Sequence, residues 1–141
     1  MTQRQMNELI RHQKPLCLPT TASVQEACRR MAERKVGAVL VTSGDQTLQG
    51  IFTGRDAVTR VVADAKNPAK TPLAEVMTPN PTSTSADCTA IGCLRLMQDC
   101  GVRHIPIVEG GKAVGVVSRR DFRGHEQDRL DEETGLWERI A

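Results

Sequence analysis

The sequence predicts an α/β (α+β) fold in which two β-α-β-β-α repeats pack sheet to sheet with pseudo-twofold symmetry. Residues 15–36 correspond in type to residues 81–102 at a constant offset of 66 and without a gap. Each half also contains one helical apolar stripe, followed by two short apolar runs that a glycine-containing turn joins. Because one such unit exposes a sheet face that it cannot cover, two copies are expected to bury that face against each other.

The repeats divide the chain into four segments. We expect repeat 1 at residues 7–66, a linker at 67–75, repeat 2 at 76–124 and a helical tail at 125–141. The offset falls from 66 to 65 at Gly50 and Gly115, so the two hairpins differ in length by one residue. The linker begins with a proline-containing stretch that ends the preceding helix.

Repeat 1 begins with an extended piece at residues 16–18. The next segment is predicted to be a helix, because its apolar residues follow an i, i+3, i+4, i+7, i+8 pattern and Ser23 and Glu26 form a capping box. The apolar run at 36–41, a turn at 43–45 and a strand ending at Phe52 predict a β-hairpin. A second helix is predicted from Thr53. The first stripe contains Val24, Ala27, Cys28, Met31 and Ala32, and the second helix runs through Val58, Val61 and Val62.

Repeat 2 has the same order of elements. An extended piece at 82–84 precedes a helix for which Asp87 and Thr89 are the candidate caps. An apolar run at 105–108, a turn at 109–111 and a strand ending at Val117 then predict the second hairpin. The helix carries a stripe of Ala90, Cys93, Leu94 and Met97.

Composition argues against several kinds of partner. The chain has two Phe, one Trp and no Tyr, so it lacks aromatic platforms for single-stranded nucleic acid. The formal net charge of +2 is spread without the basic stripe that duplex DNA requires. The longest apolar run is far shorter than the roughly 20 residues that span a bilayer, and the N-terminus lacks a signal-peptide core. We therefore expect a cytoplasmic protein without a membrane or nucleic-acid partner.

Catalytic and metal-binding motifs are missing as well. The five cysteines include no C-x-x-C pair, so reduced thiols are expected, with redox sensing as the alternative. The sequence contains no nucleophile elbow, Walker loop or dinucleotide fingerprint, and the segment after His125 lacks the second His of a zinc protease. We expect neither an enzyme nor a catalytic cofactor nor a metal site.

The most informative motif occurs twice. Thr53-x-x-Asp56 and Ser118-x-x-Asp121 each follow the end of a strand and open a helix. A helix start offers unpaired N–H groups and partial positive charge that suit a phosphate. The hydroxyl adds a donor, and the carboxylate can accept two hydrogen bonds from a ribose diol.

Two interpretations of this motif remain open at the level of the sequence. Arg55 and Arg120, each one residue before the aspartate, can supply charge for a phosphate. The same spacing is also a capping box, which satisfies a helix end and needs no ligand.

These residues resemble a known family, the tandem cystathionine-β-synthase-like (CBS) domain pair, or Bateman module. The resemblance covers about residues 7–124. It implies a module for signal transduction or energy sensing that binds AMP, ADP or ATP, and in some members NAD(H) or S-adenosylmethionine, between its repeats. The matching segments are Met77-Thr78-Pro79, Gly101-Val-Arg-His-Ile-Pro-Ile-Val108, Gly50-Ile-Phe-Thr-Gly-Arg-Asp56 and Gly115-Val-Val-Ser-Arg-Arg-Asp121.

The resemblance also implies roles for individual residues. Asp56 and Asp121 would hold ribose hydroxyls, and Thr53 and Ser118 would contact the ribose or the first phosphate. His104 also matches a position that carries a phosphate-binding Arg in some members, so its assignment to one cleft remains open. The adenine pocket would consist of Thr82, Val102 and His104 in the cleft of Asp56, and of Leu16, Val36 and Ala38 in the cleft of Asp121.

The two clefts are expected to be unequal, because Gly37 and Ala38 of the first copy stand where the second copy has Arg103 and His104. Which cleft is filled stays open. Members of the family commonly dimerise, so we expect a homodimer and an unidentified protein target. The tail either docks on its own module or presents Trp137 as an interface anchor. The alternative function is a purely structural or protein-interaction module with empty clefts.

Overall fold

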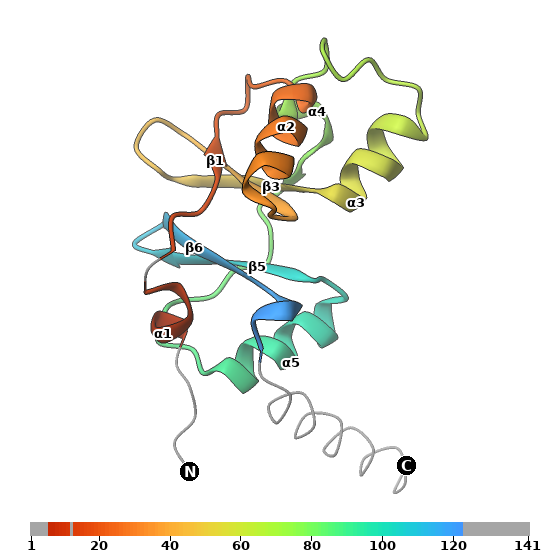
Figure 1. Cartoon of the computed structure of the whole chain (residues 1–141). Coiled ribbons are helices and arrows are strands. Elements are labelled where there is room, and N and C mark those ends of the chain that lie inside the picture. The colour runs from red at the N-terminus through yellow and green to blue at the C-terminus, as the bar shows by residue number, and fades with distance from the viewer. Residues whose placement is uncertain (1–5, 12, 123–141) are drawn as a thin grey trace, which may run out of the picture.

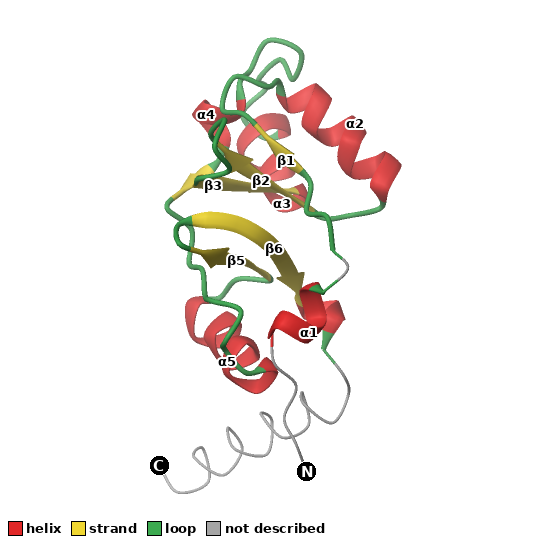
Figure 2. Cartoon of the chain, turned by 90° about the vertical axis from the view of Figure 1, so that its left-hand side faces the viewer, coloured by secondary structure: helices red, strands yellow, loops and turns green. Residues whose placement is uncertain are grey.

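The computed structural model describes residues 6–11 and 13–122. Two α/β units are stacked so that their strands face each other in the middle and their helices lie on the two outer sides (Figure 1, Figure 2). The predicted tail at 125–141 lies outside the described residues. The elements in chain order are α1 (Met6–Ile10), β1 (Cys17–Leu18), α2 (Val24–Arg34), β2 (Ala38–Thr42), β3 (Leu48–Thr53), α3 (Gly54–Asp56), η1 (Ala57–Val62), α4 (Leu73–Val76), β4 (Thr78–Pro79), α5 (Ala90–Cys100), β5 (His104–Glu109), β6 (Lys112–Ser118) and η2 (Arg119–Asp121).

The sheet topology confirms the predicted repeat. One sheet has the strand order β1-β2-β3-β4, and the other contains the antiparallel pair β5-β6. In the first sheet, Leu18 pairs in parallel with Val41. In the second repeat, an isolated parallel bridge joins Thr84 to Ile107. These two residues lie 66 positions after Leu18 and Val41, so the same pairing occurs in both repeats.

The two long helices start and end in equivalent ways. The Ser23 hydroxyl accepts the Glu26 N–H at 3.1 Å at the start of α2, which is one of the two contacts of the predicted capping box. Thr89, and not Asp87, is the cap of α5, where its hydroxyl accepts the Gly92 N–H at 3.1 Å. Both helices end in the left-handed conformation that closes many helices. The residues in this conformation are Lys35 (φ 55°) and Gly101 (φ 67°).

The second helix of repeat 1 is present, but most of it is a π-helix. It begins at Gly54 but changes to a π-helical segment over Ala57–Val62, with an N–H of Ala63 donating to the Val58 carbonyl five residues earlier. The wider turn alters the angle between successive side chains, so Val61 enters the core while Val58 and Val62 remain 61% and 73% exposed. The segment is therefore helical, as predicted, but only one of its three valines, Val61, reaches the core.

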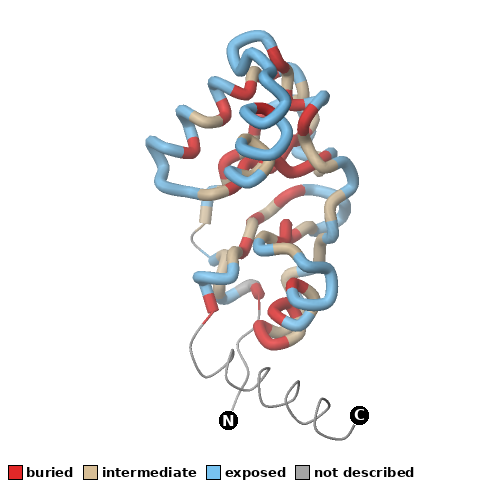
Figure 3. Tube along the Cα trace, turned by 90° about the vertical axis from the view of Figure 1, so that its right-hand side faces the viewer, coloured by how far each residue is buried: buried red, intermediate tan, exposed pale blue. Residues whose placement is uncertain are grey.

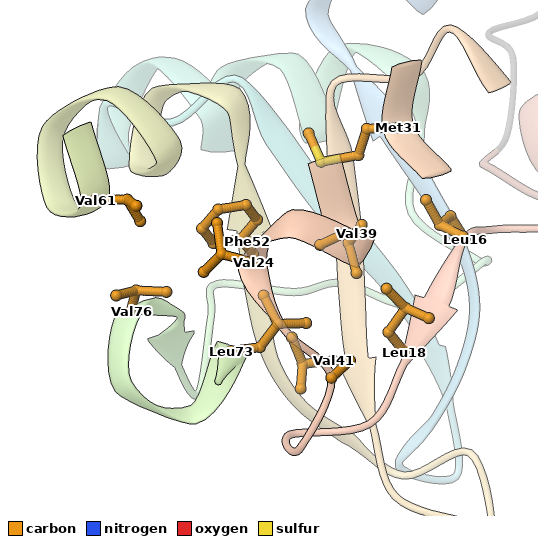
Figure 4. Packing of buried hydrophobic residues seen from close by; sticks show 12 residues of the cluster. Leu16, Leu18, Val24, Met31, Val39, Val41, Phe52, Val61, Leu73 and Val76 are labelled. Atoms are coloured by element: carbon orange, nitrogen blue, oxygen red, sulfur yellow. The ribbon is translucent and has the colours of Figure 1, made fainter. Parts of the chain in front are cut away.

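Two apolar cores lie on the outer sides of the two sheets, and the buried residues concentrate in the strands and inner helix faces (Figure 3). Phe52, Val24 and Val39 occupy the centre of the first core (Figure 4). Leu94 and Ile105 belong to the second core.

The short helices α1 and α4 each pack in the core of the other half of the chain. Leu73 and Val76 of α4 are buried in the first core, together with the strands of repeat 1. Met6 of α1 is fully buried in the second core, and α1 contacts β6. Residues 7–10 and 73–76 correspond at the offset of 66, so α4, which begins within the segment expected to be the linker, is the counterpart of α1, and each of these helices packs against the sheet of the other half. Each core is thus completed by a segment from the other half of the chain.

The inner faces of the sheets meet in a third cluster formed by Ala38, Leu40, Ile51 and Ala113. The hairpin turns add two hydrogen bonds between the repeats. The Leu48 N–H donates to the Gly111 carbonyl at 3.2 Å, and the Ala113 N–H donates to the Gln46 carbonyl at 2.9 Å. These contacts set the spacing of the clefts beside the cluster.

Candidate functional site

Two cavities lie between the repeats, one beside each strand-end motif. The Asp56 cavity has a volume of about 560 Å³. The Asp121 cavity has a volume of about 380 Å³. Both volumes fall in the range of roughly 300–1,000 Å³ that is typical of small-molecule sites.

The Asp56 cavity brings together all six residues that the sequence assigned to it. Thr53, Arg55 and Asp56 come from the end of β3 and from α3, whereas Thr82 and Val102 come from repeat 2. His104, at the start of β5, completes the set. The lining also includes Gly37 and Arg103, which the sequence had named only as a difference between the clefts, and six residues that sequence reasoning missed: Ile51, Gly54, Thr78, Asn80, Pro81 and Gly101.

Arg103 could have been assigned to this site from the sequence, because it is a basic residue next to two predicted site residues, Val102 and His104. Asn80 gives no such signal, since its place in the lining depends on the course of the chain after β4.

The Asp121 cavity contains Ser118, Arg120, Asp121, Val36 and Ala38, together with His104. Leu16, the remaining predicted residue, is only 3% exposed and belongs to the first core, not to the lining of either cavity. Its side chain points into the core with those of Val39 and Leu18 (Figure 4). Gln13 and Lys35 line the cavity without having been predicted.

The Asp56 carboxylate is held by its own helix start. Its Oδ2 accepts the Thr53 N–H at 2.9 Å and the Thr53 hydroxyl at 3.1 Å. The guanidinium of Arg60, one turn later, lies 3.6 Å from Oδ1. The side chain of Asp56 is 13% exposed. This network fixes the carboxylate at the rim of the cavity, and since a carboxylate has about four acceptor positions, it retains capacity for a further donor.

Asp121 is anchored similarly, because its Oδ2 accepts the Ser118 N–H at 2.7 Å. Both aspartates therefore form the capping contact that the sequence left as an alternative to ligand binding. The capping contact and a ligand contact are compatible, since the cap fixes the carboxylate beside the cavity.

His104 lies where the two cavities meet. Together with Gly37, it lines both of them. A Cβ added to Gly37 would lie 3.2 Å from His104 Nε2, so the absence of a side chain at residue 37 makes room for the imidazole. Burial lowers the pKa of His104, and the nearby Arg120 and Arg103 lower it further against the opposing effect of Asp121. The imidazole is therefore neutral at pH 7.

Two negative findings apply to residues 6–11 and 13–122. In this part of the chain, His, Cys, Asp and Glu do not gather in threes in a way that could hold a metal ion. No helix in it has both the length and the apolar character needed to cross a bilayer.

Comparison with known proteins identifies the family. The CBS domain family matches the chain twice in tandem, at residues 7–63 and 73–127. The chain belongs to the CBS domain family. This CBS pair is 38% identical over 108 residues to the CBS domain-containing protein CBSCBSPB1 of Arabidopsis thaliana, covering 77% of the chain and 20% of that relative. It is 36% identical over 106 residues to YlbB of Bacillus subtilis, covering 74% of the chain and 71% of that protein.

The plant relatives are much longer, since the chain spans about a fifth of CBSCBSPB1. Solved structures of CBS proteins match the fold over most of the chain. The CBS domain protein PAE2072 of Pyrobaculum aerophilum, solved in complex with AMP, has a TM-score of 0.80 and 25% identity, covering 91% of this chain and 98% of that one. The CBS domain protein NE2398 has a TM-score of 0.78 and 28% identity, covering 85% of this chain and 94% of that one.

Proposed function

We propose that this CBS pair is a non-catalytic regulatory module that binds an adenine nucleotide between its repeats and transmits the bound state to a partner protein. The observation that carries the proposal is the arrangement around Asp56. A carboxylate fixed by a helix start, an adjacent hydroxyl and two arginines line one cavity of nucleotide size. The AMP complex of PAE2072, a protein of the same family and fold, supports this assignment.

Each part of the cavity matches one part of a nucleotide. The Asp56 carboxylate accepts hydrogen bonds from the ribose diol, and Thr53 contacts the ribose or the first phosphate. Arg55 and Arg103 line the same cavity and supply the positive charge that phosphates require. Val102 offers an apolar surface to the adenine. AMP, ADP and ATP share these groups, and they are the ligands that we propose.

The Asp121 cavity repeats this chemistry in a smaller volume, with Ser118, Arg120 and Asp121 in the equivalent positions. We propose unequal affinities, with the larger Asp56 cavity as the stronger site. A homodimer in the cytoplasm, with a protein target that responds to the nucleotide, completes the proposal.

One observation favours a second candidate, a structural or protein-interaction module without a ligand. Both aspartates already serve as helix caps, which accounts for their presence without a nucleotide. This candidate predicts that nucleotides leave the melting temperature unchanged and that partner binding does not depend on them.

Calorimetry and thermal melting with AMP, ADP, ATP, NAD(H) and S-adenosylmethionine separate the two candidates. A micromolar ligand at 100 times its Kd stabilises the fold by about 2.7 kcal/mol. Asp56→Ala removes the ribose contact and is expected to weaken binding about ten- to a hundredfold. Thr89→Ala is the matched control, because it removes a helix cap away from both cavities. No binding by any of these compounds would contradict the nucleotide proposal and support the structural candidate.

A further inference from the structure

Lys35 occupies a backbone position that ordinarily favours glycine. It ends α2 with φ 55° and ψ 43°, and its N–H donates to the carbonyls of Ala32 and Met31. The equivalent residue in repeat 2 is Gly101, with φ 67° and ψ 30°. In the left-handed conformation a Cβ is crowded by the backbone, so a lysine at this position is less favourable for the fold than a glycine.

The same lysine lines the Asp121 cavity. Residues 35–38 contribute to that cavity, and the equivalent residues 101–104 contribute to the Asp56 cavity. Each four-residue segment contains one lysine or arginine, but in different places: Arg103 is the third residue of its segment, whereas Lys35 is the first. Gly37 stands where repeat 2 has Arg103, so Lys35 is the cation that this segment contributes to the Asp121 cavity.

The charge balance supports a binding role. His104 is neutral at pH 7, so the positive charge in the lining of the Asp121 cavity comes from Lys35 and Arg120, opposed by Asp121. Without Lys35 the formal charge of the lining would fall from +1 to zero, which would weaken its attraction for an anion.

We propose that Lys35 is an anion-binding residue of the Asp121 cavity that contacts the phosphates of a bound nucleotide, and that it is retained there at a cost in backbone strain. This inference rests on the proposed function and adds to it a residue that the strand-end motif does not contain. It also separates the two cavities chemically, since the Asp56 cavity has an arginine in this role and the Asp121 cavity has a lysine.

The inference predicts opposite effects of one substitution on stability and on binding. Lys35→Gly relieves the left-handed strain, so Tm is expected to rise by about 2 °C. The same change is expected to weaken ATP binding about tenfold, because a charge-assisted hydrogen bond is lost. Adenosine has no phosphate, so its affinity is expected to stay unchanged.

The binding experiment uses the Asp56→Ala background, which directs the ligand to the Asp121 cavity, and measures ATP and adenosine by calorimetry. Ala65→Gly is the matched control, because Ala65 has the same φ of 55° and lines neither cavity. It should raise Tm without changing ATP affinity. Lys35→Asn, which suits the left-handed conformation but carries no charge, should weaken ATP binding as Lys35→Gly does.

The outcomes distinguish the two proposals. If ATP binds the parent and Lys35→Gly equally, the role of Lys35 is overturned while the nucleotide proposal stands. If the wild-type protein binds no nucleotide, both proposals are overturned. Equal losses of ATP and adenosine affinity would also overturn the inference, because they would indicate a change in cavity shape and not in charge. A lower Tm for Lys35→Gly would contradict the proposed strain.

Discussion

Gly50→Ala tests the contact between β3 and residues 77–78, which directly follow the exchanged helix α4. A Cβ on Gly50 of β3 would lie 2.5 Å from Met77 Sδ and 2.9 Å from the Thr78 carbonyl oxygen, closer than real Cβ contacts allow. The carbonyl belongs to β4, which pairs with β3 at this point, so it cannot move without breaking the pairing. We expect overpacking to lower the free energy of unfolding by about 1–3 kcal/mol. The corresponding fall in Tm is about 4–12 °C.

Urea denaturation of Gly50→Ala and Gly44→Ala provides the measurement. Gly44 lies in the first hairpin turn, and a Cβ there would meet no atom within 4 Å. Its substitution is expected to change stability by less than about 0.5 kcal/mol. Adding Met77→Ala to Gly50→Ala removes the clash with sulfur but not the clash with the carbonyl, so part of the loss should remain. Equal stability of Gly50→Ala and Gly44→Ala would refute the tight contact of β3 with Met77 and Thr78.

Further predictions concern the core, the cap, a thiol and pH. Phe52→Ala should cost about 3–5 kcal/mol by urea denaturation, because Phe52 is fully buried in the first core. Thr53→Ala should cost about 1 kcal/mol, whereas Thr53→Ser should restore the cap. Burial raises the pKa of Cys93 to about 12, so alkylation at pH 8 should label exposed Cys100 and reach Cys93 only after unfolding. The pKa of His104 lies below its ordinary 6.5 in the folded state, so the unfolded chain binds the proton first and the free energy of unfolding should fall as pH drops below about 6.5. His104→Asn should lack this fall, and equal pH profiles of the two proteins would contradict the assignment.

Local patterns were sufficient to predict much of the fold and of the site. The stripe on α2 and the cap at Ser23 depend on residues within one turn of each other, so the sequence reveals them directly. The π-helical segment could not be predicted, because Val58, Val61 and Val62 have a spacing that an ordinary helix also accommodates. Leu16 was expected in a cleft because the family resemblance implied that the first strand contacts the adenine, but the packing of β1 directs its side chain into the core.

The sequence missed Lys35 and Gln13 because their places in the Asp121 cavity depend on backbone conformation and on a contact between distant parts of the chain. Lys35 enters the Asp121 cavity because α2 ends in a left-handed residue, and that conformation is read more readily from a glycine than from a lysine. Gln13 enters through contact with the other repeat, where its side-chain amide donates to the Val116 carbonyl at 2.8 Å. Such a contact over 103 positions of sequence leaves no trace in local periodicity.

The exchanged helices α1 and α4 also determine how the chain responds to being cut. Residues 63–70 between the two halves are exposed, so a protease could reach them without first opening either core. The two fragments should nevertheless stay associated without a covalent link, because each still carries a helix that packs in the core of the other. Separate expression of the halves should therefore yield fragments that complement each other when they are mixed.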